Sequence, residues 1–308
     1  MSKPPPDTDA PEPVLLIIAD ISGYTRYMTA NAKTLSHSQT IITELITAMI
    51  QQIELPLEVA KLEGDAIFLY CRKQQSLKPW NETKRIIGDK LLTFFRMFSQ
   101  KVSELSQSTT CTCNACTHIE KLQLKLVVHS GEALFHRVLN FLELAGVDVI
   151  IVHRLLKNSV HADQYLLLTE AASRELEFSM AIQLNQSMET YDDLGGIKTL
   201  VYLPDGERKP ELATPLPFKR RFAQSLKLFC KLWFAPFAAH SGSFRHVTSS
   251  TSGAAKAGFA VLTALLTPIF LPVGTISVLF RALGSSTKSQ HADNCHEHKS
   301  DGSCCHKH

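Results

Sequence analysis

Residues 14–28 read VLLIIADISGYTRYM, and the rest of the fold is built around this stretch. Five apolar residues, Val14 to Ile18, are followed by Ala19 and a single acid, Asp20. A short run that is apolar at every position predicts a central β-strand buried on both faces. An acid at the carboxyl end of such a strand lies where α/β sheets usually place their chemistry. Because a buried carboxylate needs a partner, we expect a metal ion there.

A second stretch, residues 57–71 (LEVAKLEGDAIFLYC), predicts a strand, a tight turn at Glu63-Gly64 and a second strand that opens at Asp65. If this hairpin lies beside the first strand, Asp20 and Asp65 meet and supply oxygen ligands for Mg²⁺. Such a site requires that the two side chains converge and that no cationic group fills the space between them. The simpler alternative is that Asp20 is a turn or helix N-cap residue.

The remaining pattern predicts an α+β domain over residues 13–206. Apolar residues at spacings of three and four predict two long helices, and hairpins, shorter helices and strands surround them. The order β-α-β-β-α-β is that of a ferredoxin-like core. The expected elements are helices at 37–53 and 81–105, a hairpin over 122–139 turning at Ser130-Gly131, a helix at 146–157, a strand at 164–168, a helix at 171–176 and a strand at 197–203.

Four motifs in this domain resemble those of class III nucleotide cyclase catalytic domains. Residues 20–25 (DISGYT) resemble the opening motif, and residues 61–65 (KLEGD) resemble the hairpin motif. Residues 127–132 (VVHSGE) look like the later strand with its glycine, and residues 146–154 are similar to the helix that ends in a catalytic arginine. The four occur in the family's order, so together they are more specific than any one alone. The chain resembles a divergent, bacterial-type adenylate or guanylate cyclase.

This resemblance implies a purine nucleoside triphosphate as ligand, Mg²⁺ or Mn²⁺ as cofactor, and formation of cyclic AMP or cyclic GMP with pyrophosphate. It also implies a homodimer, because in this family the metal-binding acids come from one subunit and the other site residues from its partner. The resemblance implies that Asp20, Asp65 and the backbone carbonyl of Ile21 bind the metal ions. It implies that Lys61 and Glu143 contact the purine and that Lys198 contacts a phosphate. Arg154 is implied to stabilise the charge on the transferring phosphate.

Simpler roles stand beside two of these assignments. Lys61 is equally explained as a solvated strand residue, and Arg154 as the partner of a surface acid. The clearest departure from the family is Ile150, which stands where the family has an asparagine that orients the ribose. Isoleucine cannot form a side-chain hydrogen bond, and loss of one positioning group commonly costs roughly 10²-fold or more in rate. The alternative function is therefore a catalytically silent nucleotide-binding or dimerisation module that takes part in signalling.

A cysteine-rich segment at residues 111–118, CTCNACTH, is a second candidate metal site. Cys111, Cys113, Cys116 and His118 offer four soft ligands within eight residues, which suits Zn²⁺. This segment would make the protein a metal-responsive sensor, and the alternative is a loop of reduced cysteines. The His/Cys-rich tail, residues 285–308, is expected to be disordered and to bind metal weakly. Its ligands are His291, Cys295, His296, His298, Cys304, Cys305, His306 and His308.

Composition bounds the partners and the location. A net charge of +3 is too small to argue for nucleic acid. With no signal peptide, we expect a cytoplasmic domain with reduced thiols, preceded by a disordered leader at residues 1–12. Residues 207–284 are expected to associate with a membrane. They contain a basic amphipathic helix at 222–237, which suits a membrane surface or the domain itself, and an uncharged run at 257–280, longer than the ~20 residues that cross a bilayer.

Overall fold

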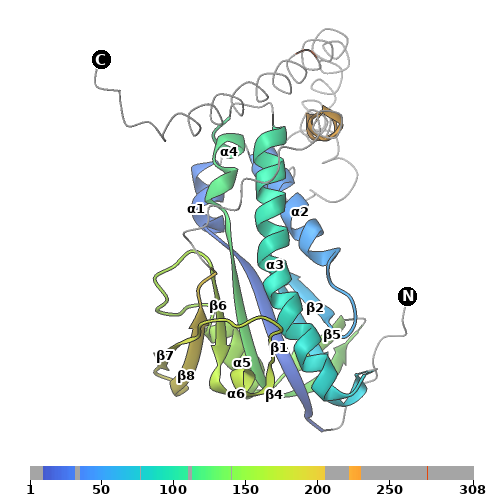
Figure 1. Cartoon of the computed structure of the whole chain (residues 1–308), viewed down its shortest axis with the longest axis vertical. Coiled ribbons are helices and arrows are strands. Elements are labelled where there is room, and N and C mark those ends of the chain that lie inside the picture. Colours follow the sequence, from blue (N-terminus) through green and yellow to red (C-terminus); the bar gives the residue numbers. More distant parts are fainter. Residues whose placement is uncertain are drawn as a thin grey trace, which may run out of the picture.

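In this computed structural model the described residues are 10–31, 35–76, 78–109, 113–139, 141–204, 222–229 and Ile276. They form one large sheet with helices packed on it (Figure 1). The strands are β1 (Glu12–Ser22), β2 (Glu58–Glu63), β3 (Ala66–Arg72), β4 (Gln123–Val138), β5 (Phe141–Ala145), β6 (Tyr165–Thr169), β7 (Asn185–Tyr191) and β8 (Gly195–Tyr202). The α-helices are α1 (Tyr24–Ala30), α2 (Leu35–Ile50), α3 (Trp80–Ser108), α4 (Asn114–Thr117), α5 (Val147–Arg154) and α6 (Glu170–Glu175), with short 3₁₀ turns at Lys73–Gln75 and Ile119–Lys121.

The topology confirms the predicted α+β class with a ferredoxin-like core. The sheet order is β2-β3-β1-β4-β6-β8-β7, and β5 pairs with β4. Within it, β1 is antiparallel to both β3 and β4, and β2 is antiparallel to β3. Helix α2 joins β1 to β2, and α3 joins β3 to β4, which completes the β-α-β-β-α-β unit. Strand β6 adds on parallel to β4, and β7, which the sequence pattern did not predict, closes the far edge.

The first strand is central and buried on both faces, as its apolar run predicts. Every residue from Val14 to Ile18 is fully buried. Leu15 and Ile17 pack into the cluster formed with α2 and α3, whereas Leu16 and Ile18 pack on the opposite side with residues of α5. Because strand side chains alternate between faces, Asp20 belongs to the α5 side of the sheet.

The predicted hairpin turn at Ser130-Gly131 is wrong. The chain continues through these residues as one strand, β4, and turns only after Val138. Gly131 pairs with Val14 of β1. A Cβ at Gly131 would lie 2.2 Å from Cγ of Asp148, so the glycine allows the side chain of α5 to approach the sheet. A glycine inside a strand can mark a bulge, a bend or the close approach of another group, and here it is the close approach of Asp148.

The described part of the C-terminal region packs on the domain. Residues 222–229 are helical, and Leu228, which is 5% exposed, joins the core cluster on the α2–α3 side. Among the described residues there is no helix with the length and apolar character needed to cross a bilayer. The uncharged run at 257–280 lies outside the described residues except for Ile276, as do residues 1–9 of the leader and the whole His/Cys-rich tail.

Candidate functional site

The two acids expected to bind a metal converge. Asp20 lies near the end of β1, opposite Ala66 of β3, and Asp65 is the residue just before Ala66, in the turn that Gly64 allows with φ of 69°. Asp65 shares a hydrogen bond with Asp20. Burial, together with the charge of Asp20, raises the pKa of Asp65 to about 7. The two carboxylates therefore tend to hold one proton between them.

A lysine that the sequence pattern did not identify as a site residue lies against this pair. Lys125 of β4 is the register partner of Asp20, and its Nζ lies 2.8 Å from Asp20 Oδ2. Both side chains are largely buried, at 21% and 14% exposed. Burial lowers the pKa of Lys125, but the hydrogen bond and charge of Asp20 outweigh it, so that the pKa is raised. With both acids ionised, the group carries a net charge of about −1, and with the shared proton it is neutral.

Polar side chains continue from Asp20 and Lys125 to the next strand of the sheet, β6. Lys125 pairs in register with Tyr165 of β6, whose hydroxyl accepts a 2.7 Å hydrogen bond from Asn158 Nδ2. Burial raises the pKa of Tyr165, so this hydroxyl remains a neutral donor and acceptor. Ile21, the expected backbone ligand, pairs with Leu124 and buries its side chain on the opposite face. Asp20, Lys125 and Tyr165 therefore form a polar row across three neighbouring strands, on the face that α5 covers.

The two residues expected to contact a purine also come together. Lys61 Nζ lies 3.1 Å from Glu63 Oε1 and 3.6 Å from Glu143 Oε2. His153 Nε2 approaches both carboxylate oxygens of Glu63, at 3.2 and 3.3 Å. The hydrogen bond from Lys61 to Glu63, with the added charge of Glu143, raises the pKa of Lys61. Because Lys61 is nearly half exposed, these ion pairs contribute little to stability and can exchange for a ligand.

Arg154 and Ile150 lie on the outer surface of α5. The guanidinium of Arg154 pairs with Asp193, and its side chain is half exposed, while Ile150 is 52% exposed. Both residues line a surface hollow of about 360 Å³, together with His153 and Lys157. Lys198 is exposed on β8, opposite Met188. Within the part of the chain that the structure describes, the ion pair of Arg154 is with Asp193 and involves neither Asp20 nor Asp65.

A polar network centred on the buried His129, which the sequence pattern did not reveal, fastens α5 to the sheet. His129 of β4, 7% exposed, has its Nδ1 2.9 Å from Thr169 Oγ1 and its Nε2 2.9 Å from Asp148 Oδ1. The other oxygen of Asp148 accepts the backbone N–H of Glu132 at 2.7 Å. Thr169 also caps α6 by accepting the N–H of Ala172. The network positions α5, and with it the exposed Arg154, relative to β4.

The cysteine segment is arranged differently from the expected Zn²⁺ set. Cys113 and Cys116 lie at the start of and within α4, and Nδ1 of His37 on α2 lies 3.4 and 3.8 Å from their sulfurs. His118 is partly exposed, with its Nδ1 2.9 Å from the carbonyl oxygen of Asn114. Cys111 lies outside the described residues. His37 was not predicted as a ligand because 76 residues separate it from Cys113.

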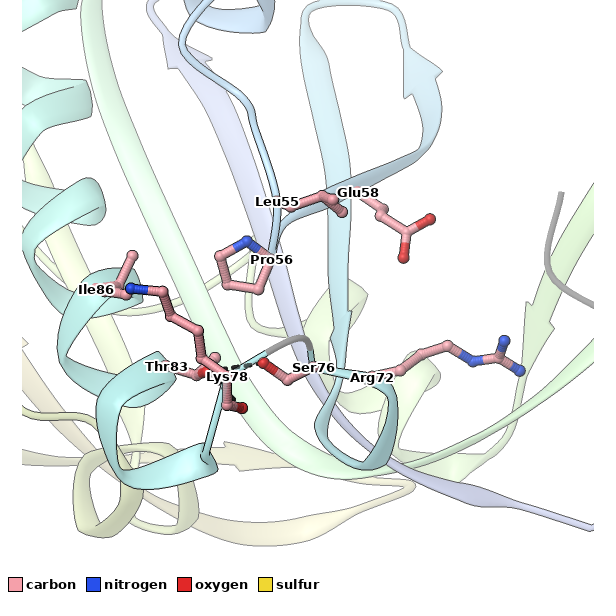
Figure 2. A pocket seen from close by; sticks show the side chains of 8 residues that line it. All are labelled: Leu55, Pro56, Glu58, Arg72, Ser76, Lys78, Thr83 and Ile86. Atoms are coloured by element: carbon pink, nitrogen blue, oxygen red, sulfur yellow. Dashed lines mark hydrogen bonds between the residues drawn. The ribbon is translucent and has the colours of Figure 1, made fainter. Parts of the chain in front are cut away.

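A second hollow, of about 140 Å³, lies at the far end of β3 from Asp65 (Figure 2). The hydroxyls of Ser76 and Thr83 are 2.7 Å apart beside it. It is smaller than the roughly 300–1,000 Å³ that ligand pockets usually occupy, so we assign it no function. Its lining residues are Leu55, Pro56, Glu58, Arg72, Ser76, Lys78, Thr83 and Ile86.

Comparison with known proteins gives a family of unknown function, DUF2652, whose model matches residues 42–165. The uncharacterized protein Rv2561/Rv2562 of Mycobacterium tuberculosis is 31% identical over 143 residues, which is 46% of this chain and 64% of that protein. The chain thus spans somewhat less than two thirds of this curated relative.

Solved structures with a similar arrangement include three cyclases. The adenylyl cyclase CyaB from P. aeruginosa aligns with a TM-score of 0.48 at 10% identity, over 64% of this chain and 97% of that one. The guanylyl cyclase Cya2 aligns with a TM-score of 0.45 at 8% identity, over 65% and 96%. The guanylate cyclase domain of RhGC from Catenaria anguillulae, in complex with GTP, aligns with a TM-score of 0.43 at 14% identity, over 62% and 96%.

Proposed function

We propose that this chain binds a purine nucleoside triphosphate together with Mg²⁺ or Mn²⁺, at a site built on Asp20 and Asp65. The observation that supports this most directly is the convergence of the two carboxylates at the end of the central strand. Two adjacent acids that share a proton form an oxygen-rich site for a hard divalent cation. When bound there, the metal would polarise the phosphates of the nucleotide.

The charges of Asp20, Asp65 and Lys125 determine how a metal ion and a nucleotide can bind at this site. Asp65 must give up the shared proton before both carboxylates can act as ligands, and its pKa of about 7 makes this step cheap at neutral pH. Lys125 removes one unit of negative charge from the pair, so the acids alone hold a divalent cation weakly. The anionic triphosphate supplies the missing oxygens and charge, and we expect Lys125 to turn from Asp20 toward its phosphates. We therefore expect metal and nucleotide to bind together.

The rest of the site belongs to a second copy of the chain in this proposal. Arg154 and Lys157 line a hollow on the outer face of α5, where they are available to phosphates held by another subunit. Apolar side chains are also exposed on α5 and on β5: Val147 of α5 is 63% exposed and Phe141 of β5 is 69% exposed. A surface that combines cations with exposed aromatic and aliphatic groups suits a homodimer interface.

A catalytically silent, nucleotide-binding signalling module is the second candidate function, and two observations favour it. Ile150 offers no hydrogen bond at the position where the resemblance implies a ribose contact, and it faces solvent on α5. The Lys125–Asp20 ion pair weakens the metal site on which cyclisation would depend. Binding without product formation is what this alternative predicts.

Calorimetric titration separates these cases. Purified protein is titrated with non-hydrolysable ATP and GTP analogues in Mn²⁺, and hydrolysable nucleotides are assayed in parallel for cyclic product by mass spectrometry. We expect metal-dependent nucleotide binding that Asp65→Ala abolishes and that Asp163→Ala, a change at an exposed acid, preserves. Cyclic product lost in Asp65→Ala establishes a cyclase, and binding without product establishes the silent module. If neither nucleotide binds, or if Asp65→Ala binds normally, the proposal is wrong.

A further inference from the structure

The strongest feature outside the candidate nucleotide site is the meeting of two thiols and an imidazole between α2 and α4. The ligand atoms of His37, Cys113 and Cys116 all lie within 4.8 Å of one another. They come from segments 76 residues apart in the chain. Cys116 is buried, and the other two are partly buried, so the group lies at the edge of the core and remains reachable from solvent. We propose that His37, Cys113 and Cys116 form a Zn²⁺ site that fastens α4 to α2.

The distances between the ligand atoms suit this ion. Zn²⁺ binds thiolate sulfur at about 2.3 Å and imidazole nitrogen at about 2.0–2.1 Å in tetrahedral sites, which places the nitrogen about 3.6 Å from each sulfur. The observed distances from His37 Nδ1, 3.4 Å to Cys113 Sγ and 3.8 Å to Cys116 Sγ, lie on either side of that value. No disulfide joins the two cysteines. Three protein ligands leave the fourth position open to water or an added ligand.

The surroundings hold the group in place before any metal binds. Tyr27 of α1 donates a 3.0 Å hydrogen bond to the carbonyl of Ala115, which lies between the two cysteines. Asn114 Nδ2 donates to Asn31 Oδ1 at 2.9 Å. These contacts fix α4 against α1, so the two sulfurs are already turned toward α2. A preorganised site of this kind binds metal without first ordering its ligands.

The position of the site suggests what it stabilises. Helix α4 is only four residues long and is followed by a 3₁₀ turn, so its own hydrogen bonds contribute little. Helix α1 begins four residues after Asp20, and α4 packs against both α1 and α2. A metal that bridges α2 and α4 therefore stiffens the layer that supports the Asp20 end of β1. The site itself is independent of whether the domain binds nucleotide.

The test must separate this site from the His/Cys-rich tail of the same chain, so it reads each cysteine individually. Full-length protein is stripped with a chelator, incubated with or without Zn²⁺, and treated with N-ethylmaleimide, and modification is followed peptide by peptide with mass spectrometry. We expect Zn²⁺ to slow modification of Cys113 at least tenfold. The tail cysteines lie on other peptides and do not enter this measurement.

Three variants complete the experiment. His37→Ala removes a proposed ligand and should abolish the Zn²⁺ protection of Cys113. His37→Cys supplies a different soft ligand at the same place and should retain most of it. His118→Ala is the matched control: this partly exposed histidine lies two residues from Cys116 yet outside the group, so its removal should leave protection unchanged.

The outcomes are decisive in either direction. Protection that depends on residue 37 and not on His118 supports the site. Absence of Zn²⁺ protection at Cys113 in the wild-type protein overturns the proposal, as does protection that survives in His37→Ala. If His37→Ala fails to fold, wild type and His37→Cys still decide the matter, and Co²⁺ titration of both should show sulfur-to-metal charge-transfer absorption that a Cys113→Ser exchange weakens.

Discussion

Lys125 Nζ lies 2.8 Å from Asp20 Oδ2, directly across the β1–β4 ladder. The lysine ammonium thus already pairs with one of the two carboxylates that are expected to hold a cation. Either it competes with a metal ion or it turns toward phosphates when a nucleotide binds. We expect the second behaviour, and the difference between the two is measurable.

Replacement of Lys125 by methionine should separate metal from nucleotide binding. The change removes one positive charge next to Asp20, so affinity for Mn²⁺ alone should rise at least tenfold. If Lys125 also contacts phosphate, affinity for the nucleotide at saturating Mn²⁺ should fall. Lys121→Met, at an exposed position, is the control and should alter neither. If the Mn²⁺ affinity of Lys125→Met equals that of the wild type, the Lys125–Asp20 ion pair does not weaken metal binding by the two acids.

The stability of the metal-free protein should decrease as the pH rises. The pKa of Asp65 is raised by burial and by Asp20 from 3.8 to about 7 in the folded state, so between these values the folded state holds more proton than the unfolded state. This contribution to the free energy of unfolding is therefore present below about pH 4 and lost as the pH rises to about 7. Chemical denaturation in chelator at several pH values measures it. Asp65→Asn should flatten this dependence and be more stable than wild type at pH 8.

Gly131→Ala should be strongly destabilising, although glycine in a strand is usually replaceable by alanine. A Cβ at this position would lie 2.2 Å from Asp148 Cγ, so the carboxylate must move and its bonds to His129 and the Glu132 N–H are lost. We expect the free energy of unfolding to fall by about 1–3 kcal/mol, as is typical when an extra methyl group is forced into a packed site. Gly196→Ala is the matched control, because its Cβ would meet only Met188, with Sδ at 3.4 Å. If both changes lower the free energy of unfolding equally, Gly131 is not specifically required for the approach of Asp148 to β4.

Replacement of Ile150 by asparagine tests whether this one position limits the rate at which the domain cyclises nucleotide. The asparagine restores hydrogen-bonding capacity at a position that is 52% exposed on α5, so the fold should tolerate it without loss of stability. If the domain cyclises nucleotide slowly, the rate should rise roughly 10²-fold. Product is measured by mass spectrometry with Mn²⁺ and either ATP or GTP. A rate unchanged by the exchange would mean that residue 150 does not face the ribose.

Much of the fold was predictable because its determinants are local. The all-apolar run at the start of β1 predicts a buried strand, and the Glu63-Gly64 turn predicts the β2–β3 hairpin, which places Asp65 beside Asp20. Strand β7 was missed because its sequence, NQSMETY, is polar and sits at the sheet edge with most side chains exposed or half-exposed. Gly131 was misjudged because the residue that needs the space, Asp148, is 17 positions away.

The site was predicted less completely, because its missed contacts join residues that are far apart in the sequence. Lys125 follows Asp20 by 105 positions and is identified as its partner only by the register of β1 and β4. His37 meets Cys113 only because α2 and α4 pack together, whereas His118, close to both cysteines in sequence, turns to the Asn114 carbonyl. The sequence signal for Lys125 was a single lysine in the alternating pattern of β4, on the same face as Asp20. Contacts between distant segments depend on the packed fold, and spacing along the chain does not encode them.

The most direct test of the proposed metal and nucleotide site is an anomalous-diffraction map of crystals grown with Mn²⁺ and a non-hydrolysable purine triphosphate. We expect a Mn²⁺ peak at about 2.0–2.4 Å from carboxylate oxygens of both Asp20 and Asp65, with Lys125 turned away from Asp20 toward phosphate oxygens. An intact Lys125–Asp20 ion pair with no peak between the two acids, in crystals that contain the nucleotide, would contradict the proposed site.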